Sequence, residues 1–469
     1  MGKYKTLVGN SLYTFIGQIG SKTVTLIMLP FYTKWLSVED YGITDIITIY
    51  ASLIVCIATL SIHEAIFVFP VNKPLEKQKE YFSTSLFSSV VSVFFVFVVF
   101  IALKYIGNSF VITNSFFDNL WYIAVLFVTT YFQTFSQQFC RGINQMQTFC
   151  FSGIIVTVFT ALLAFLFIPS YGIYGYILSI SVANLVGIIY TFISIKINKY
   201  VSIKSVGVNC WSELVKYSIP LIPNAILWWI ISALNRLFLE SSIGIESIGI
   251  FAVANKFPGI AAMLLAIFNN SWQISVLQEY GEKGFDEFFN KISKIYIPLI
   301  IILSALLGLF CEDTFKLFVD DKFYEGWHYS LVMCTAVVGM NGSGFYGSVF
   351  SAVKQSKYYL YSSIVGGFVA VILNVFLIPI IGLWGATLSF ALSHLSIWIV
   401  RIYYSKKFVK CNNLWLFISF FFIEIIIIIE IINGYKLIAW MCFLLLVSLY
   451  CLVNREFFIK VRVLVDKFR

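Results

Sequence analysis

The chain has 469 residues, of which 60% are hydrophobic, 18% aromatic and only 12% charged. Soluble domains are about half apolar and about a quarter charged, so this composition excludes an ordinary cytosolic enzyme. The formal net charge of +9 would suit a nucleic-acid binder, but in so apolar a chain the placement of the charges decides what they mean. We interpret the chain as an all-α polytopic membrane protein.

Hydropathy predicts about fourteen transmembrane helices, since one span needs about 20 apolar residues. The first apolar stretch is too long for a signal-peptide core and lacks a small-residue cleavage site, so we expect it to be a retained helix. The approximate cores of the spans are residues 9–33, 43–69, 83–106, 119–140, 149–169, 172–195, 213–238, 247–271, 293–311, 327–352, 358–379, 382–404, 413–433 and 436–453.

The basic residues gather on one side of the predicted membrane. With the N-terminus inside, 24 of the 32 Lys and Arg residues fall in cytoplasmic segments and five in outer segments. This asymmetry follows the positive-inside rule and requires an even number of spans. Both termini are therefore predicted to be cytoplasmic.

Cysteine and histidine give no sign of a metal or redox site. The nine Cys are scattered without a C-x-x-C pair, and His63, His328 and His394 lack metal-ligand spacing. We expect no metal, no cofactor and no disulfide framework.

The sequence contains an internal duplication. At an offset of 207 residues, LVGNSL at 7–12 matches LVKYSI at 214–219, and LSVEDYG at 36–42 matches IGIESIG at 243–249. At an offset of 210, FIPSYGIYGYILS at 167–179 matches LIPIIGLWGATLS at 377–389, and Gln145 matches Gln355. Each repeat holds six spans, so the two copies enter the membrane from the same side, as in transporters built from parallel repeats.

The duplication predicts the domain organisation. We expect a first six-helix lobe at residues 1–196, a cytoplasmic linker at 197–212 and a second six-helix lobe at 213–405. Two appended helices at 411–453 and a basic cytoplasmic tail at 454–469 follow. A cavity between two such lobes is the usual substrate site of parallel-repeat transporters.

Three cations lie inside predicted spans, and none is duplicated. Lys22 and Lys256 fall near the membrane midplane, whereas Arg236 is closer to the outer interface, where it could simply snorkel. An ionisable group inside a membrane costs from about 3 to more than 10 kcal/mol unless it has a partner or faces a cavity. The three are therefore candidate ligands for an anionic substrate, and structural ion pairs with Asp45, Glu64 or Glu240 are the alternative.

Polar groups in the second and seventh spans are further candidates. Asp45, His63 and Glu64 could couple proton movement to transport, although a solvated pair at the inner mouth explains His63 and Glu64 equally well. Pro220 and Pro223, near the inner end of span seven, remove backbone donors and could form a gating hinge.

Span seven also carries Asn224, Trp228 and Trp229. An indole can stack on the face of a sugar, so we count these three side chains as candidate substrate contacts. Packing against neighbouring helices is the alternative role of the two Trp.

The opening stretch through LSVEDYG and the segment ALNRLFLESSIGIESIGIFAVANKF at 233–257 resemble the polysaccharide transporter (O-antigen and capsule oligosaccharide flippase) family. That family belongs to the multidrug/oligosaccharidyl-lipid/polysaccharide exporter superfamily. In this resemblance Arg236 and Lys256 match positions that are commonly basic. The chain departs from the pattern at Asn235, where Asp is frequent, and at Val68, where Arg is frequent.

The resemblance implies a flippase of the bacterial inner (plasma) membrane that moves polyprenyl-diphosphate-linked oligosaccharide from the inner to the outer leaflet. Glycan polymerase or ligase enzymes would be its protein partners. A cationic cavity is chemically suited to this task, because a diphosphate cannot enter hydrocarbon without counter-charge.

Two alternatives remain open at this stage. One is an ion-coupled multidrug antiporter, which would need an intramembrane carboxylate for a cationic substrate. The other is a membrane glycan polymerase or acyltransferase, but the outer loops at 107–118 and 312–326 carry only scattered acids with no His base partner. We therefore expect a transporter and not an enzyme.

Overall fold

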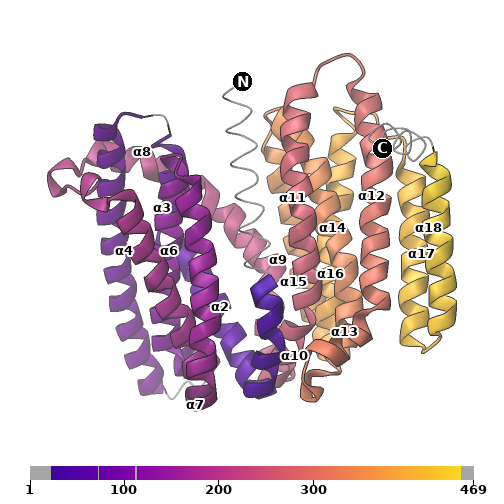
Figure 1. Cartoon of the computed structure of the whole chain (residues 1–469), viewed down its shortest axis with the longest axis horizontal. Helices are drawn as coiled ribbons and strands as arrows, with labels where there is room; N and C mark the ends of the chain where they lie inside the picture. The colour runs from indigo at the N-terminus through magenta and orange to yellow at the C-terminus, as the bar shows by residue number, and fades with distance from the viewer. Residues whose placement is uncertain (1–22, 72, 111–113, 456–469) are drawn as a thin grey trace, which may run out of the picture. The chain divides into compact units, whose positions relative to one another are not determined.

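The computed structural model describes residues 23–71, 73–110 and 114–455. These residues contain no strand, which confirms the all-α fold class. Residues 23–35 are helical. The helices that follow (Figure 1) are α2 (Val38–Ala58), α3 (Ile62–Val68), α4 (Leu75–Phe110), α5 (Ser115–Asp118), α6 (Leu120–Gly142), α7 (Met146–Ile195), α8 (Val208–Ser218), α9 (Ile222–Ser242), α10 (Ile245–Ala254), α11 (Lys256–Glu279), α12 (Phe285–Leu309), α13 (Cys311–Phe318), α14 (Gly326–Ala352), α15 (Lys357–Ile381), α16 (Leu383–Ser405), α17 (Leu414–Ile432) and α18 (Lys436–Val453).

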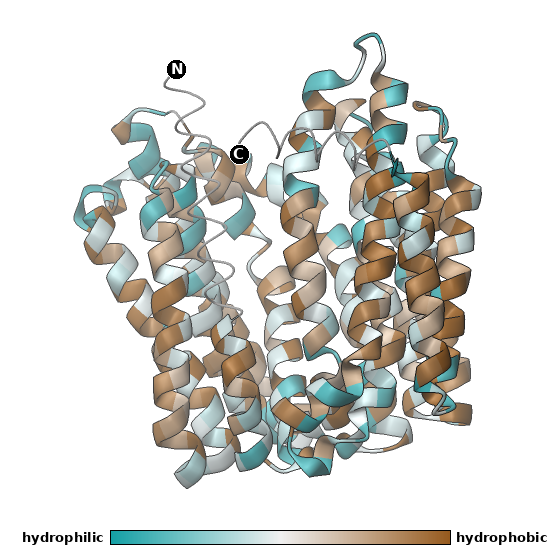
Figure 2. Cartoon of the chain, turned by 45° about the vertical axis from the view of Figure 1, so that its right-hand side comes forward, coloured by the Kyte–Doolittle hydropathy of each residue, from teal (hydrophilic) through white to brown (hydrophobic). Residues whose placement is uncertain are grey.

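Within the described residues, ten helices are long and apolar enough to cross a membrane. The number is below fourteen partly because α7 runs for 50 residues and covers two predicted spans. The first predicted span begins outside the described residues. In addition, α6 and α14 are not among the ten helices, because they carry many polar and small side chains that lower their hydropathy. In α14, 22 of the 27 residues are buried. Figure 2 shows apolar residues along the middle of the helices and polar residues at their ends and in the turns. The protein is a multi-pass membrane protein.

The chain forms two compact units. One holds the chain up to Trp229 together with Ile245–Gly249, and the other holds Ile230–Gly244 with Ile250 onward. The division differs from the repeat boundary because α8 and the first part of α9 pack with the first unit. The segment predicted as a linker contacts α4, where the Ser83 hydroxyl donates to the Tyr200 carbonyl at 2.9 Å. The lobe boundaries inferred from the repeat stay predictions.

In the first unit, α6 packs against α2, α3, α4 and α7. Its aromatic face forms the core: Tyr131, Phe135 and Phe139 are fully buried, and the Phe139 ring lies 4.4 Å from that of Phe82 on α4. The Tyr131 hydroxyl contacts the Ser89 hydroxyl of α4 at 2.5 Å. The buried Tyr131 hydroxyl therefore has a polar partner on a neighbouring helix.

In the second unit, α14 packs against α11, α12 and α16. Its Phe345 ring stacks on Trp272 of α11 with ring centroids 4.6 Å apart, and the Trp272 indole donates to the Phe345 carbonyl at 3.2 Å. The appended helices α17 and α18 pack on each other and on α12. The centre of this unit is thus α14, the counterpart of α6 in the repeat.

The internal geometry of the two units repeats at the predicted offset of 210. Asn144 and Lys354, which precede the paired Gln145 and Gln355, both have positive φ, 60° and 55°. The backbone N–H of Gln145 donates to the carbonyl five residues earlier at 2.8 Å, and that of Gln355 does so at 3.0 Å. These equal turns agree with a duplication of one ancestral unit.

Glycine marks a second repeated turn. Gly172 has φ 52° and ψ −126°, and Gly382 has φ 59° and ψ −131°. Residues with a Cβ rarely adopt this conformation, so glycine is required at both sites. Both follow a proline by three residues, Pro169 or Pro379. The same proline and glycine pair therefore reverses the chain direction after α15 and in the middle of α7.

A reciprocal crossing joins the starts of α2 and α10 within the first unit. A Cβ added at Gly42 would collide with the Ile245 carbonyl oxygen, and a Cβ added at Gly249 would collide with the Val38 carbonyl oxygen. The offset of 207 maps Val38 onto Ile245 and Gly42 onto Gly249. The contact therefore has two-fold character, and small residues let the two backbones approach each other closely.

An ion pair fastens α18 to α13 in the second unit. The Glu312 carboxylate lies 2.6 Å from the Lys316 ammonium, contacts the Lys436 ammonium at the start of α18, and accepts from the Tyr324 hydroxyl at 2.8 Å. The hydrogen bonds from Lys316 and Lys436 lower the pKa of Glu312 to about 2. This cluster therefore connects α18 to α13 and to the turn that follows α13, all within the second unit.

Replacing Gly42 or Gly249 by Ala should destabilise the protein by about 1 to 3 kcal/mol, since overpacking a close contact forces the backbones apart. The measurement is the apparent melting temperature of the purified protein in detergent. Gly259→Ala is the matched control, because nothing lies within 4 Å of a Cβ added there and Ala is the better helix former. Equal effects of the three substitutions would contradict the close crossing.

Glu312→Gln should lower the melting temperature at pH 7 and lose this effect in acid. Because the folded-state pKa of Glu312 is depressed to about 2, its stabilisation is present above about pH 4.5 and disappears as the pH falls toward 2. Melting curves of wild type and variant at several pH values test this. Glu287→Gln is the control, because it alters an exposed carboxylate and should change the melting temperature little at any pH. If the effect of Glu312→Gln did not depend on pH, the proposed stabilisation by the ionised Glu312 would be refuted.

Candidate functional site

The predicted site residues belong to different parts of the structure. Lys22 lies outside the described residues. The first unit contains Asp45, His63, Glu64, Pro220, Pro223, Asn224, Trp228 and Trp229. The second unit contains Arg236 and Lys256. Each group is therefore described by itself.

His63 and Glu64 follow a break in the second predicted span. Between α2 and α3, Leu60 and Ser61 both have φ 51°, a conformation that is uncommon for residues with a Cβ. The His63 side chain is buried, and its Nε2 lies 3.6 Å from Oε1 of Glu64, whose side chain is 45% exposed. This pair forms an ion pair when His63 is protonated, so its geometry permits proton binding. The coupling role stays a prediction.

Asp45 lies elsewhere on α2. It is half-buried and stands one helical turn after Tyr41, on the same face of the helix. The structure describes no contact that joins Asp45 to His63 or Glu64. Its coupling role also stays a prediction.

The prolines of span seven interrupt the helix as their chemistry requires. α8 ends at Ser218, a 3₁₀ segment (Ile219–Leu221) holds Pro220, and Pro223 lies in the first turn of α9. Pro220 is exposed. The use of this 3₁₀ segment as a hinge remains a prediction.

Asn224, Trp228 and Trp229 follow on α9, and all three are half-buried. The Trp229 indole donates to the Ile49 carbonyl of α2 at 3.2 Å, so this ring has a packing role in the first unit. The offset of 207 pairs Trp229 with Lys22 and Ile49 with Lys256. The two positions that meet in this hydrogen bond are thus the repeat counterparts of the two predicted midplane lysines.

Arg236 is held inside the second unit. Its side chain is 6% exposed, and one guanidinium nitrogen donates to the Ser232 carbonyl at 2.5 Å and to Oδ1 of Asn235 at 3.0 Å. The guanidinium also lies over the Phe251 ring at 4.5 Å. Asn235, which precedes it in α9, thus holds the guanidinium through its amide oxygen. Arg236 is therefore buried among partners and does not reach the surface by snorkelling.

Lys256 stands at a helix break that hydropathy does not show. The predicted span 247–271 is divided into α10 and α11 at Asn255, and Lys256 is the first residue of α11. The last carbonyls of α10 carry partial negative charge, which favours a cation beside them. The Lys256 side chain is half-buried, so it is only partly accessible from outside the protein.

Arg401 is a buried cation that the sequence analysis did not place among the candidates, because it was counted with the 24 basic residues of the cytoplasmic segments. It is 4% exposed in α16, and its guanidinium donates to the Ser362 hydroxyl at 3.1 Å and to the Ser343 carbonyl at 2.9 Å. It also lies over the Tyr359 ring at 4.8 Å. The signal was available, since residue 401 falls inside the predicted span 382–404.

The repeat explains the position of Arg401. An offset of 210 maps Arg401 onto Thr191 and Ser362 onto Ser152, and Thr191 donates to Ser152 at 3.1 Å in the first unit. The same two positions are therefore hydrogen-bonded in both units, with a hydroxyl in one and a guanidinium in the other. The second repeat thus has the same contact as the first, but with a charged Arg401 in place of the neutral Thr191.

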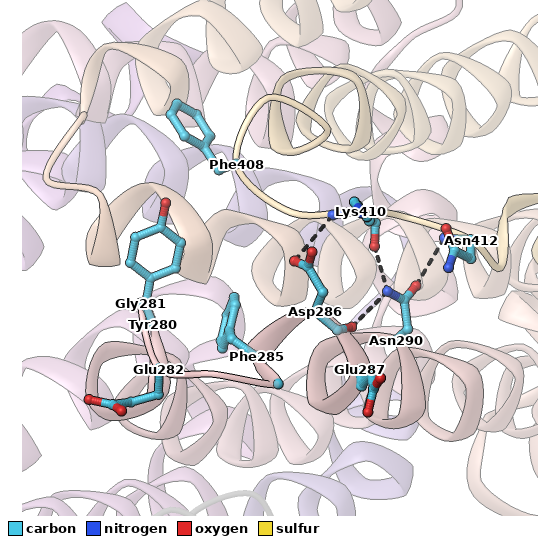
Figure 3. A pocket seen from close by; sticks show the side chains of 11 residues that line it. Tyr280, Gly281, Glu282, Phe285, Asp286, Glu287, Asn290, Phe408, Lys410 and Asn412 are labelled. Carbon is cyan, nitrogen blue, oxygen red and sulfur yellow. Dashed lines mark hydrogen bonds between the residues drawn. The ribbon is translucent and has the colours of Figure 1, made fainter.

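A polar pocket of about 820 Å³ lies where the turn after α11 meets the segment before α17. Figure 3 shows Asn290 in it, which donates to the Lys410 carbonyl at 2.5 Å and accepts from the Asn412 backbone at 2.9 Å. Glu282, Asp286 and Glu287 make the pocket acidic. None of the predicted site residues lines it, and its hydrogen bonds hold the segment before α17 in place.

A family model described as polysaccharide biosynthesis protein matches residues 7–273, more than half of the chain. The chain belongs to this family. The match includes the duplicated segments around Gly42 and Gly249 and the positions Arg236 and Lys256. A search of curated proteins finds no match.

Solved structures confirm the fold. The lipid II flippase MurJ in an inward closed conformation matches with a TM-score of 0.71 at 12% identity, over 96% of this chain and 100% of that one. An inward-facing multidrug resistance MATE family transporter matches with 0.66 at 11% identity, over 84% and 94%. A MOP superfamily transporter from Pyrococcus furiosus matches with 0.58 at 14% identity, over 86% and 95%. This family member therefore has the polytopic fold of MOP superfamily transporters.

Arg401→Leu should lower the free energy of unfolding by about 1 to 3 kcal/mol, because it removes the two buried hydrogen bonds that the guanidinium donates to the Ser343 carbonyl and the Ser362 hydroxyl. Detergent melting curves measure the effect. Lys357→Ala, which removes an exposed cation at the start of α15, serves as the control. If Arg401→Leu melted like the wild type, the buried contacts would carry no net stability.

Proposed function

We propose that this family member is a flippase that moves a polyprenyl-diphosphate-linked oligosaccharide from the inner to the outer leaflet of a bacterial plasma membrane. The movement proceeds by alternating access through a cationic cavity, with both chain termini in the cytoplasm. Lys22, Arg236 and Lys256 provide the counter-charge for the diphosphate. Glycan polymerase or ligase enzymes that use the delivered product are its partners.

The observation that carries this proposal is the pair of cations on either side of α10. Arg236 is buried and donates to the Ser232 carbonyl and to Oδ1 of Asn235, and Lys256 begins α11 just after the break at Asn255. A broken helix within a membrane protein exposes backbone polar groups where a substrate or ion can use them. Two cations near such a break favour an anionic substrate.

The energetics agree with a flip that needs no second ion. An inside-negative potential of about 100 mV favours the outward movement of two negative charges by roughly 4.6 kcal/mol. Protein cations replace the hydration that the diphosphate loses, while the prenyl chain remains in lipid. The break at Pro220 and Pro223 in span seven is suited to a hinge in this cycle.

The alternatives predict different chemistry. A multidrug antiporter for cationic amphiphiles needs a carboxylate on the transport path, and Glu424, which is fully buried, lies on the appended helix α17. A glycan polymerase or acyltransferase needs acid–base groups gathered in one site. Dye efflux from cells and turnover by the purified protein respectively test these two functions.

Lys256→Ala or Lys22→Ala should reduce export of the lipid-linked glycan at least tenfold, equivalent to about 1.4 kcal/mol of lost substrate stabilisation. The readout is surface glycan in cells that depend on this protein, together with the amount of protein inserted in the membrane. Lys256→Arg should retain most of the activity, since it keeps the charge.

Lys283→Ala is the matched control, because Lys283 is an exposed cation in the turn before α12. It should export normally. Normal export by both Lys22→Ala and Lys256→Ala, with normal insertion, would overturn the cationic cavity.

A further inference from the structure

An apolar groove of about 870 Å³ runs along the second unit between α15, α16 and α17. Its walls include Leu373 of α15, Leu395 and Ile402 of α16, and Ile418 and Phe422 of α17. Ile418 and Phe422 are 57% and 63% exposed. The protein's own side chains therefore leave this space open.

The groove has the length of one leaflet. Along α16 and the residue that follows it, the lining extends from Leu392 to Lys406, which at 1.5 Å per residue is about 21 Å. Half of the hydrocarbon core of a bilayer is about 15 Å thick. One acyl chain therefore fits along the groove from the membrane surface to the midplane.

A groove with such walls does not hold water in a membrane. Water needs two to four polar partners, and apart from Ser396, Tyr403 and Lys406 the side chains that line this groove are aliphatic or belong to Phe and Trp. Lipid chains are the molecules that surround a membrane protein and match this surface. The groove is therefore filled by an apolar chain.

One end of the groove is charged. Lys406 lines it directly after the last residue of α16, is exposed, and makes no ion pair within the described part of the chain. The neighbouring Lys407 instead lies over the rings of Tyr404 and Tyr358, at 5.2 and 5.6 Å. Lys406 is thus the basic side chain at the mouth of the groove, on the side predicted to be cytoplasmic.

Hydrogen bonds hold the backbone at Lys406 and the segment that follows it. Its backbone N–H donates to the Ile402 carbonyl at 3.2 Å, and the segment after it is held by Asn290 of α12 through Lys410 and Asn412 (Figure 3). A cation on such a fixed segment offers a defined site for a phosphate group.

We propose that this groove binds an anionic glycerophospholipid of the cytoplasmic leaflet. Its acyl chain lies between α16 and α17, and its phosphate group meets the Lys406 ammonium. The charge complementarity at Lys406 selects an anionic headgroup, while the apolar walls select the chain. None of the proposed transport residues lines this groove, and the proposal does not depend on the transported substrate.

The repeat supplies a matched control. The offset of 210 maps Lys406 onto Lys196, which is also exposed and follows the last residue of α7. α17 and α18 come after the second repeat and have no counterpart in the first. Lys196 therefore has the same charge and helix-end position without the wall that α17 provides.

The test uses the full-length protein in nanodiscs that contain equal amounts of phosphatidylglycerol and phosphatidylcholine with the same acyl chains. Lipids that remain bound after transfer to detergent are quantified by mass spectrometry. Wild type and Lys406→Arg should retain phosphatidylglycerol over phosphatidylcholine. Lys406→Glu should reduce that preference about fivefold, as expected for about 1 kcal/mol per basic residue near the surface, and Lys196→Glu should leave it unchanged.

A second variant, Leu395→Trp, fills the groove and should lower retention of both lipids; melting curves show whether it is folded, and Lys406→Glu alone decides the result if it is not. Equal retention of the two phospholipids by the wild type would overturn the proposal, as would an unchanged preference in Lys406→Glu. Preferential displacement of phosphatidylglycerol by added polyprenyl phosphate would also overturn it, since the groove would then belong to the lipid carrier.

Discussion

Hydrocarbon offers a polar group neither a hydrogen-bond partner nor a counter-charge, and this constraint governs both units of the structure. Most of the backbone that the structure describes is helical, and several buried polar side chains meet across helices. In the first unit Ser152 accepts from Gln133 and Thr191. In the second unit Ser362 accepts from Arg401. The polar contacts are therefore as much a part of each core as the aromatic rings around them.

The sequence predicted the helical fold well because long apolar segments and repeated turn residues are local signals. Prolines and glycines at an offset of 210 are typical of turns, and the structure has these turns at Gly172 and Gly382. Sequence could not predict that α6 and α14 would be the buried centres, since their polar and small residues reduce the apolar signal that defines a span. The breaks at Ser61 and Asn255 were also missed, because neither position carries the proline or glycine that usually marks one.

The candidate site was harder to predict, because a charge has meaning only through its neighbours. Arg236 was found from its position inside a span, but its contacts with Asn235 and Phe251 depend on packing. Arg401 was overlooked because it stands close to Lys406 and Lys407, which follow α16, and a cytoplasmic position was expected there. Knowing that a charge is in a membrane segment does not reveal whether it serves a ligand or a structural contact.

The crossing of α2 and α10 bears on how the chain arose. Because Gly42 meets Ile245 while Gly249 meets Val38, the two halves present the same patch to each other, as identical subunits do in a symmetric dimer. Two copies of a half-length ancestor could have formed this contact before their genes fused. After fusion each copy became free to change on its own, which allowed cations such as Arg236 and Lys256 to arise in one half only while the shared crossing kept both glycines.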